Sequence, residues 1–279
     1  MRNLHIINEE ELKPLVVAKL NNIDKPIRLH FHQNYEISFI LEGGHEYHIG
    51  HKTYSINDFD LFVVNKNQVH TASSLPGKPM TRFSVKFLPS LVQPFFDSAD
   101  LLSLFNEAGR RHSNKIIIPQ DRREWLIAQF EKMLDQSAYA WEVKRKLILC
   151  EIIIFLNKTI KNKFDFPENH QDPSPFNELI DFIISNIATD LSLDQLARFA
   201  GISKYHLARQ FKERFGISIY QYILTQRIGK AVLLLEKGKN INEISDLTGF
   251  NTYSNFIAAF KKIKGLPPLQ FKRQILKMD

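Results

Sequence analysis

The chain of 279 residues contains a single cysteine, Cys150, so no disulfide can form within it. A chain without disulfides is typical of a reducing compartment, and the cytoplasm is the expected location. Long hydrophobic runs are also lacking, because the longest one, Leu147–Leu156, is interrupted by Glu151 and is too short to span a bilayer. No signal-peptide pattern opens the chain. We therefore expect no membrane partner.

Positive charge is present but unevenly distributed. Residues 191–279 contain 15 Lys and Arg against 6 Asp and Glu, whereas residues 166–190 contain five acidic residues and no basic one. The excess behind the formal net charge of +7 therefore lies in the C-terminal part. Such a basic segment is typical of a protein that binds nucleic acid.

The last hundred residues repeat one pattern about 49 positions apart. Each copy predicts a short helix, a glycine at positive φ and a second helix, which is a helix-turn-helix unit. The predicted first-helix caps are Ser192 and Asn240 or Asn242, and the second helices begin at Ser203 and near Asn251. The matched positions are Leu193, Leu196, Ala197 and Gly201 with Ile241, Ile244, Ser245 and Gly249, then Leu207, Phe211, Lys212 and Gly216 with Phe256, Phe260, Lys261 and Gly265.

The second helix of such a unit enters a DNA major groove. In the first copy Leu207 and Phe211 are expected in the core. Arg209 on the free face is the expected base reader, because its guanidinium can donate two hydrogen bonds to the O6 and N7 atoms of guanine. The more flexible Lys212 is expected to meet a phosphate. The predicted DNA contacts of this copy are Ser203, Tyr205, His206, Ala208, Arg209 and Lys212.

The second copy lacks an arginine at the corresponding position, which is Ala258. We expect weaker base reading there, with Ile257 near a thymine methyl group and with Lys261, Lys262 and Lys264 neutralising phosphates. The predicted contacts are Thr252, Ser254, Asn255, Ile257 and Lys261. An ordinary solvated helix face is the alternative for any one of these residues.

The segments LSLDQLARFAGISKYHLARQFKERFG and INEISDLTGFNTYSNFIAAFKKIKGLPPLQFK resemble the DNA-binding domain of AraC/XylS-type bacterial transcription regulators, over Leu191–Arg273. The resemblance implies two units joined by a long helix, here Ile219–Glu236, with their reading helices about one DNA turn apart. It further implies activation of transcription, and with it contact with RNA polymerase. Ala258 departs from the arginine that family members often carry.

The first 90 residues predict an antiparallel β-barrel. Turn signals such as Gly43-Gly44 and Pro76-Gly77 separate β-rich runs at Glu36–Leu41, Tyr47–Ile49, Leu61–Val64 and Arg82–Phe87.

Within this region His30, His32, Glu36, Gly43 and the later His70 resemble the cupin motif, with the two first histidines expected on one strand face. In metal-dependent cupins these three histidines and the glutamate hold a first-row metal. Asn57-Asp58 and Asn65 stand where that family has Gly-Asp and proline. We expect these four side chains to bind a small-molecule effector, with a metal site or a purely structural role as the alternatives.

Two amphipathic helices are predicted at Gln120–Gln136 and Ala138–Asn162. The second carries a stripe, Trp141, Ile148, Ile152 and Phe155, that can cover the barrel or meet a second subunit. Core packing alone explains the stripe, while the family resemblance favours a homodimer. The proline-rich stretch Asp165–Pro175 predicts a linker, and a helix from Phe176 to Ala188 follows it.

The expected protein is of the α+β class. A cupin-like barrel (residues 1–90), a helical dimerisation region (91–164), the linker (165–175) and a helical DNA-binding domain (176–279) follow one another. We expect a sequence-specific regulator that binds promoter DNA and is neither an enzyme nor dependent on a cofactor. Two alternatives are a metal-dependent cupin enzyme tethered to DNA and a nucleoid protein that is indifferent to sequence.

Overall fold

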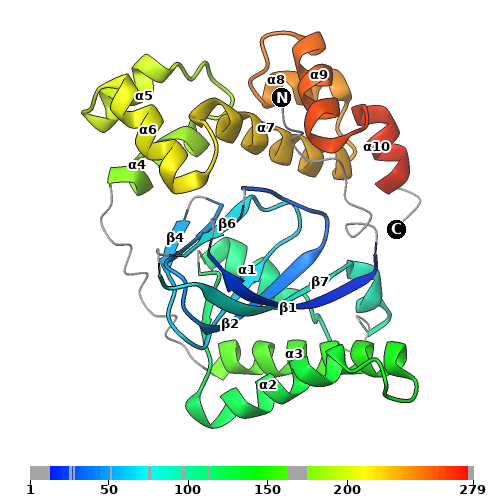
Figure 1. The fold of residues 1–279 in the computed structure, drawn as a ribbon. Helices are drawn as coiled ribbons and strands as arrows, with labels where there is room; N and C mark the ends of the chain where they lie inside the picture. The colour runs from blue at the N-terminus through cyan, green and yellow to red at the C-terminus, as the bar shows by residue number, and fades with distance from the viewer. Residues whose placement is uncertain are drawn as a thin grey trace.

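The computed structural model describes residues 13–24, 27, 29–50, 52–74, 77–95, 99–111, 113–162 and 175–275. Two β-sheets occupy the middle of the molecule, two helices cover one side, and the C-terminal helices lie on the other (Figure 1). The strands are β1 Leu15–Ile23, β2 Tyr35–Glu42, β3 Glu46–Ile49, β4 Lys52–Ser55, β5 Asp60–Val64, β6 His70–Ser73, β7 Met80–Phe87 and β8 Lys115–Ile117. The helices are α1 Ser103–Arg111, α2 Gln120–Leu134, α3 Trp141–Asn162, α4 Pro175–Ser185, α5 Leu193–Ala200, α6 Lys204–Phe215, α7 Ile219–Glu236, α8 Ile241–Leu247, α9 Tyr253–Lys264 and α10 Pro268–Ile275, with short 3-10 turns at Pro89–Leu91 and Gln93–Phe95.

All strand pairs are antiparallel, in a five-stranded sheet ordered β1-β7-β2-β5-β8 and a three-stranded sheet ordered β4-β3-β6. Successive side chains of a strand face opposite ways, and both faces of the larger sheet are covered. On β2, Ile37 and Phe39 pack toward the helices, while Ile40 packs between the sheets. Glu36 and Ser38 share the inward face with Ile40, so polar groups lie within the barrel.

The four strands expected from the sequence are present as β2, β3, β5 and β7, and the antiparallel α+β class is confirmed. Strands β1, β4, β6 and β8 are additional. β8 comes from the segment expected to be helical and pairs with β5 over three residues. The barrel is therefore completed from beyond residue 90.

Helices α2 and α3 pack against the outer face of the five-stranded sheet through a buried apolar cluster that includes Phe130 and Ile152. Phe155 lies partly buried, with its ring 5.0 Å from that of Trp125 on α2. The predicted stripe of α3 therefore faces the interior. A different stripe, Val143, Leu147 and Ile154, is 57%, 60% and 54% exposed in the single chain.

The C-terminal half contains the two expected helix-turn-helix units, with α7 between them. The predicted caps are confirmed: Ser192, Ser203 and Asn240 each accept a hydrogen bond from a backbone N–H at the start of α5, α6 and α8. The cap of α9 is Thr252, which lies next to Asn251 as expected. Both expected glycines adopt positive φ, 67° at Gly201 and 74° at Gly249.

The predicted linker Asp165–Pro175 lies outside the described residues except for Pro175, where α4 begins. None of the helices in the described ranges is long and apolar enough to cross a membrane.

Candidate effector site and DNA-binding surface

His30, His32, Glu36 and His70 come together at one end of the barrel. His30 and His70 form an isolated antiparallel bridge, His32 precedes β2, and Glu36 lies in β2. One nitrogen or carboxylate oxygen from each residue lies within 4.8 Å of the others. The segment around His30 and His32 is not a regular strand, yet both rings turn to the same side, as the spacing predicted.

The ring nitrogens of His32 and His70 are fixed by backbone carbonyls. The Nδ1 atom of His32 lies 2.9 Å from the Asn34 oxygen, and that of His70 lies 2.8 Å from the Gln68 oxygen. A carbonyl only accepts hydrogen bonds, so both Nδ1 atoms carry hydrogen and, in the neutral rings, both Nε2 atoms present lone pairs.

These two Nε2 atoms meet a third acceptor. They lie 3.0 Å and 3.3 Å from the same oxygen of Glu36, and all three side chains are almost fully buried. Burial lowers the pKa of His32 to about 4, so this ring is neutral near pH 7. Three acceptors thus converge on a point where a cation or a hydrogen-bond donor is favoured.

The polar cluster extends deeper into the barrel. The guanidinium of Arg82 donates to the Ser38 hydroxyl at 2.8 Å and to the Tyr47 hydroxyl at 3.1 Å, and it lies 3.5 Å from Glu36. The other oxygen of Glu36 accepts a hydrogen bond from Ser84 at 3.0 Å. Sequence reasoning missed Ser38, Arg82 and Ser84, although polar residues at alternate positions of β2 and β7 were a signal for them.

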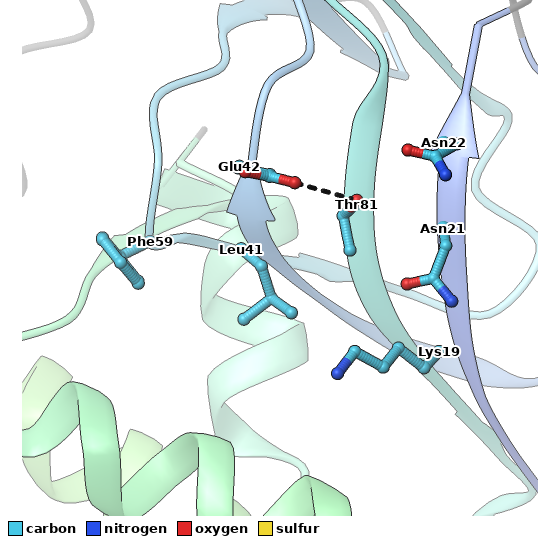
Figure 2. A pocket seen from close by; sticks show the side chains of 7 residues that line it. All are labelled: Lys19, Asn21, Asn22, Leu41, Glu42, Phe59 and Thr81. Atoms are coloured by element: carbon cyan, nitrogen blue, oxygen red, sulfur yellow. Dashed lines mark hydrogen bonds between the residues drawn. The ribbon is translucent and has the colours of Figure 1, made fainter.

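A groove of about 520 Å³ lies elsewhere, on the outer face of the five-stranded sheet beside α2 (Figure 2). Lys19 at its edge pairs with Glu131 of α2 at 2.7 Å, and Glu42 accepts a hydrogen bond from Thr81. The groove shares no residue with the histidine cluster, and these polar groups are already paired. Its lining residues are Lys19, Asn21, Asn22, Leu41, Glu42, Phe59 and Thr81.

Helix α6 presents the predicted reading face. Leu207 and Phe211 are fully buried, while Tyr205 is 81% exposed and Arg209 and Lys212 are also exposed. The guanidinium of Arg209 lies 3.4 Å from the Nδ1 atom of His206, so both can face a groove together. Ala208 is half-buried, and the Ser203 hydroxyl caps the helix.

Helix α9 differs from the expectation at one residue. Ser254, Asn255, Ala258, Lys261 and Lys262 are exposed, Ile257 is half-buried, and the Thr252 hydroxyl caps the helix. The prediction that Lys264 neutralises phosphate is wrong, because its side chain is 3% exposed and its Nζ atom lies 3.9 Å from the ring centre of Phe31 in the barrel half. The contact between α9 and the barrel segment around Phe31 buries Lys264.

Two family models match the chain. The AraC-like ligand binding domain matches residues 20–137, and a helix-turn-helix domain matches residues 196–274. Together they cover more than half of the sequence. The first match begins within β1 and contains β2–β8, and the second begins within α5 and ends within α10.

Relatives of similar length resemble most of the chain. An uncharacterised HTH-type transcriptional regulator of Bacillus subtilis, YdeC, is 22% identical over 98% of this chain and 97% of its own. The HTH-type transcriptional activator RhaR of Escherichia coli K12 is 23% identical over 87% of this chain and 86% of its own. Among solved structures, an apo ToxT variant from Vibrio cholerae aligns with 92% of this chain and 96% of its own at 18% identity and a TM-score of 0.40.

Proposed function

Since the chain belongs to the AraC-type family of DNA-binding transcription regulators, we propose that it activates transcription in response to a small molecule sensed by its barrel. Activation is supported by the relative RhaR, whose name describes an activator. An activator acts at promoters, so contact with RNA polymerase is part of the proposal. We assign the protein a binding role and no catalytic one.

The DNA contacts are proposed on α6 and α9. Arg209 is the base reader, because its guanidinium is exposed beside His206 on the free face of α6. Lys212, Lys261 and Lys262 are phosphate contacts, since they are exposed near the ends of the two reading helices. The hydroxyls of Ser203 and Thr252 cap the N-terminal turns of α6 and α9, and the proposal assigns these turns to the DNA-facing side.

The effector site is proposed at His30, His32, Glu36 and His70. The observation that carries this assignment is the convergence of buried acceptors on one point, which a structural network would avoid. An effector with a hydrogen-bond donor or a bound cation satisfies these acceptors. The effector can shift the protein between two arrangements of the surrounding strands only if it binds one arrangement more tightly than the other.

A divalent first-row metal ion is the second candidate ligand of the same four residues. Three features support it: the donor set of imidazole and carboxylate, donor atoms within 4.8 Å of one another, and Nδ1–H groups of His32 and His70 held by carbonyls. A bound ion would supply a positive charge and open coordination positions for an effector.

Both candidates are tested on the purified full-length protein. Co²⁺ binding is followed by its visible absorption, and metal content is measured after expression in rich medium. Stoichiometric metal that is lost in Glu36→Gln supports the metal candidate, and Glu131→Gln on α2 is the control. If the protein binds no metal but still protects its promoter selectively against competitor DNA, the metal candidate is wrong. An organic effector is then the remaining candidate ligand.

We also propose that two copies pair through α3. The exposed stripe of Val143, Leu147 and Ile154 is unusual on a helix whose other face is already buried. Neighbouring charged residues on α3, among them Lys144 and Glu151, surround the stripe as a polar rim.

A further inference from the structure

The segments that supply the histidines also enter the core of the DNA-binding half. His30 and His70 exchange backbone hydrogen bonds of 3.1 Å and 2.9 Å, so the backbone there is extended and neighbouring side chains face opposite ways. Leu29, Phe31 and Val69 point away from the histidine cluster. They are 7%, 4% and 4% exposed and belong to one apolar cluster with residues of α4–α10.

Phe31 is held by α9. The Lys264 ammonium lies 3.9 Å from the centre of its ring and 5.7 Å from that of Phe271. A lysine that is 3% exposed has lost most of its hydration, and an aromatic face offsets part of this cost. The end of α9 is therefore tied to the position of Phe31.

Val69 is held by α7. A Cβ atom added to Gly229 would lie 3.4 Å from the Val69 side chain and 3.6 Å from the Asn67 carbonyl oxygen, so helix and barrel segment are in close contact. The Asn67 backbone N–H donates to the carbonyl of His32 at 2.7 Å, and its side-chain amide donates to Glu236 of α7 at 2.8 Å. One residue thus connects the cluster segment to the end of α7.

Polar contacts lie beside this apolar contact between Leu29, Phe31 and Val69 and the C-terminal helices. Arg214 at the end of α6 makes a two-pronged ion pair with Glu46 of β3, at 3.1 Å and 2.8 Å. The ring of His48 lies 4.6 Å from that of Phe215.

We propose that Phe31 and Val69 are positioning residues that transmit the occupancy of the histidine cluster to α7 and α9 of the same chain. This inference rests on the proposed sensor role of the cluster. Ligand entry among His30, His32 and His70 moves the two segments, and the tightly packed side chains behind them cannot absorb the shift. Because α7 lies between the two helix-turn-helix units, its displacement changes the relative placement of the two reading helices.

The test compares a double variant, Phe31→Leu with Val69→Ala, with a matched control, Phe105→Leu with Val63→Ala. The control residues are fully buried in the other apolar cluster, between the large sheet and α1–α3. In the wild-type chain, Co²⁺ is expected to change operator affinity by about fivefold or more. The double variant should bind Co²⁺ like the wild type but show no response on DNA, while the control keeps the response. A response retained in the double variant, or lost equally in the control, overturns the proposal.

A second measurement decides the case in which no Co²⁺ binds. Hydrogen exchange of amides in residues 222–232 of α7 is compared between wild type and Glu36→Gln, a change confined to the histidine cluster. Transmission is supported if Glu36→Gln makes the α7 amides exchange faster in the wild-type background but not in the Phe31→Leu, Val69→Ala background. Unchanged exchange overturns it, whereas missing Co²⁺ uptake alone contradicts only the metal candidate. If the double variant does not fold, Lys264→Met, which removes the charge from the Phe31 ring, takes its place in both experiments.

Discussion

At the scale of single residues, Arg209 is the side chain on which sequence specificity is expected to depend. Arg209→Ala should weaken binding to the true operator by about 1–3 kcal/mol and relax the preference at one base pair. Binding to a panel of operators, each altered at one position, measures this. A loss of equal size on every sequence would make Arg209 a phosphate contact instead.

Lys212 gives the matching prediction for a phosphate contact. Lys212→Ala should weaken binding to all DNA sequences alike and reduce the slope of log affinity against log salt concentration by about 1. The comparison is made by titrating operator and unrelated DNA over a range of salt concentrations. An unchanged slope contradicts the assignment.

The two turn glycines provide a comparison within one chain. Gly201→Ala introduces a side chain at φ 67° but into open space, and the strain of that conformation costs about 1–2 kcal/mol. Gly249→Ala should cost more, because its Cβ would lie 2.7 Å from the Ile187 carbonyl oxygen and 2.8 Å from backbone atoms of Ala188. Denaturant unfolding of both variants checks the order, and an equal cost would mean that the turn after α4 moves aside freely.

At the scale of elements, α3 carries the prediction about assembly. Leu147→Glu places a charge in the middle of the exposed apolar stripe and should convert dimers to monomers, because burying an unpaired carboxylate is unfavourable. Sedimentation at micromolar concentration measures the change. Gln136→Glu, which adds the same charge at an exposed position after α2, should have no effect. A wild-type chain that is already monomeric would contradict the proposed pairing.

The elements also show how far sequence patterns reach. The helix-turn-helix units were predictable to within a residue, since caps, glycines and apolar spacing all act locally. β8 was not, because three residues derive their strand conformation from pairing with β5. The histidine cluster was found by its motif, while Arg82 was missed although it alternates with Ser84 along one face of β7. Lys264 was misplaced because the contact that buries it joins residues more than 200 positions apart.

At the scale of the whole molecule, the contact between the halves depends on pH through Glu46. Burial alone would raise the pKa of Glu46, but the hydrogen bond with His48 and the charge of Arg214 lower it to about 2. The folded pKa thus lies below the ordinary value of 4.5. Glu46 therefore contributes stability that is present above pH 4.5 and is lost as the pH falls toward 2.

Glu46→Gln should remove this part of the pH dependence and lower the free energy of unfolding at pH 7 by about 1–3 kcal/mol. Urea unfolding between pH 2 and pH 7, followed by circular dichroism, gives both quantities. Glu124→Gln, at an exposed position of α2, is the control. Parallel pH profiles for wild type and Glu46→Gln would show that the ion pair with Arg214 is not maintained in solution.

The shared core of the two halves has a consequence for building chimaeras. Leu29, Phe31 and Val69 belong to the barrel by sequence but pack among the side chains of the DNA-binding helices. A hybrid that joins this sensor to the reading helices of a relative at residues 165–175 would therefore leave a mismatched seam far from the join. Functional hybrids should require that these three barrel residues be exchanged together with the helices that they contact, including Gly229 of α7.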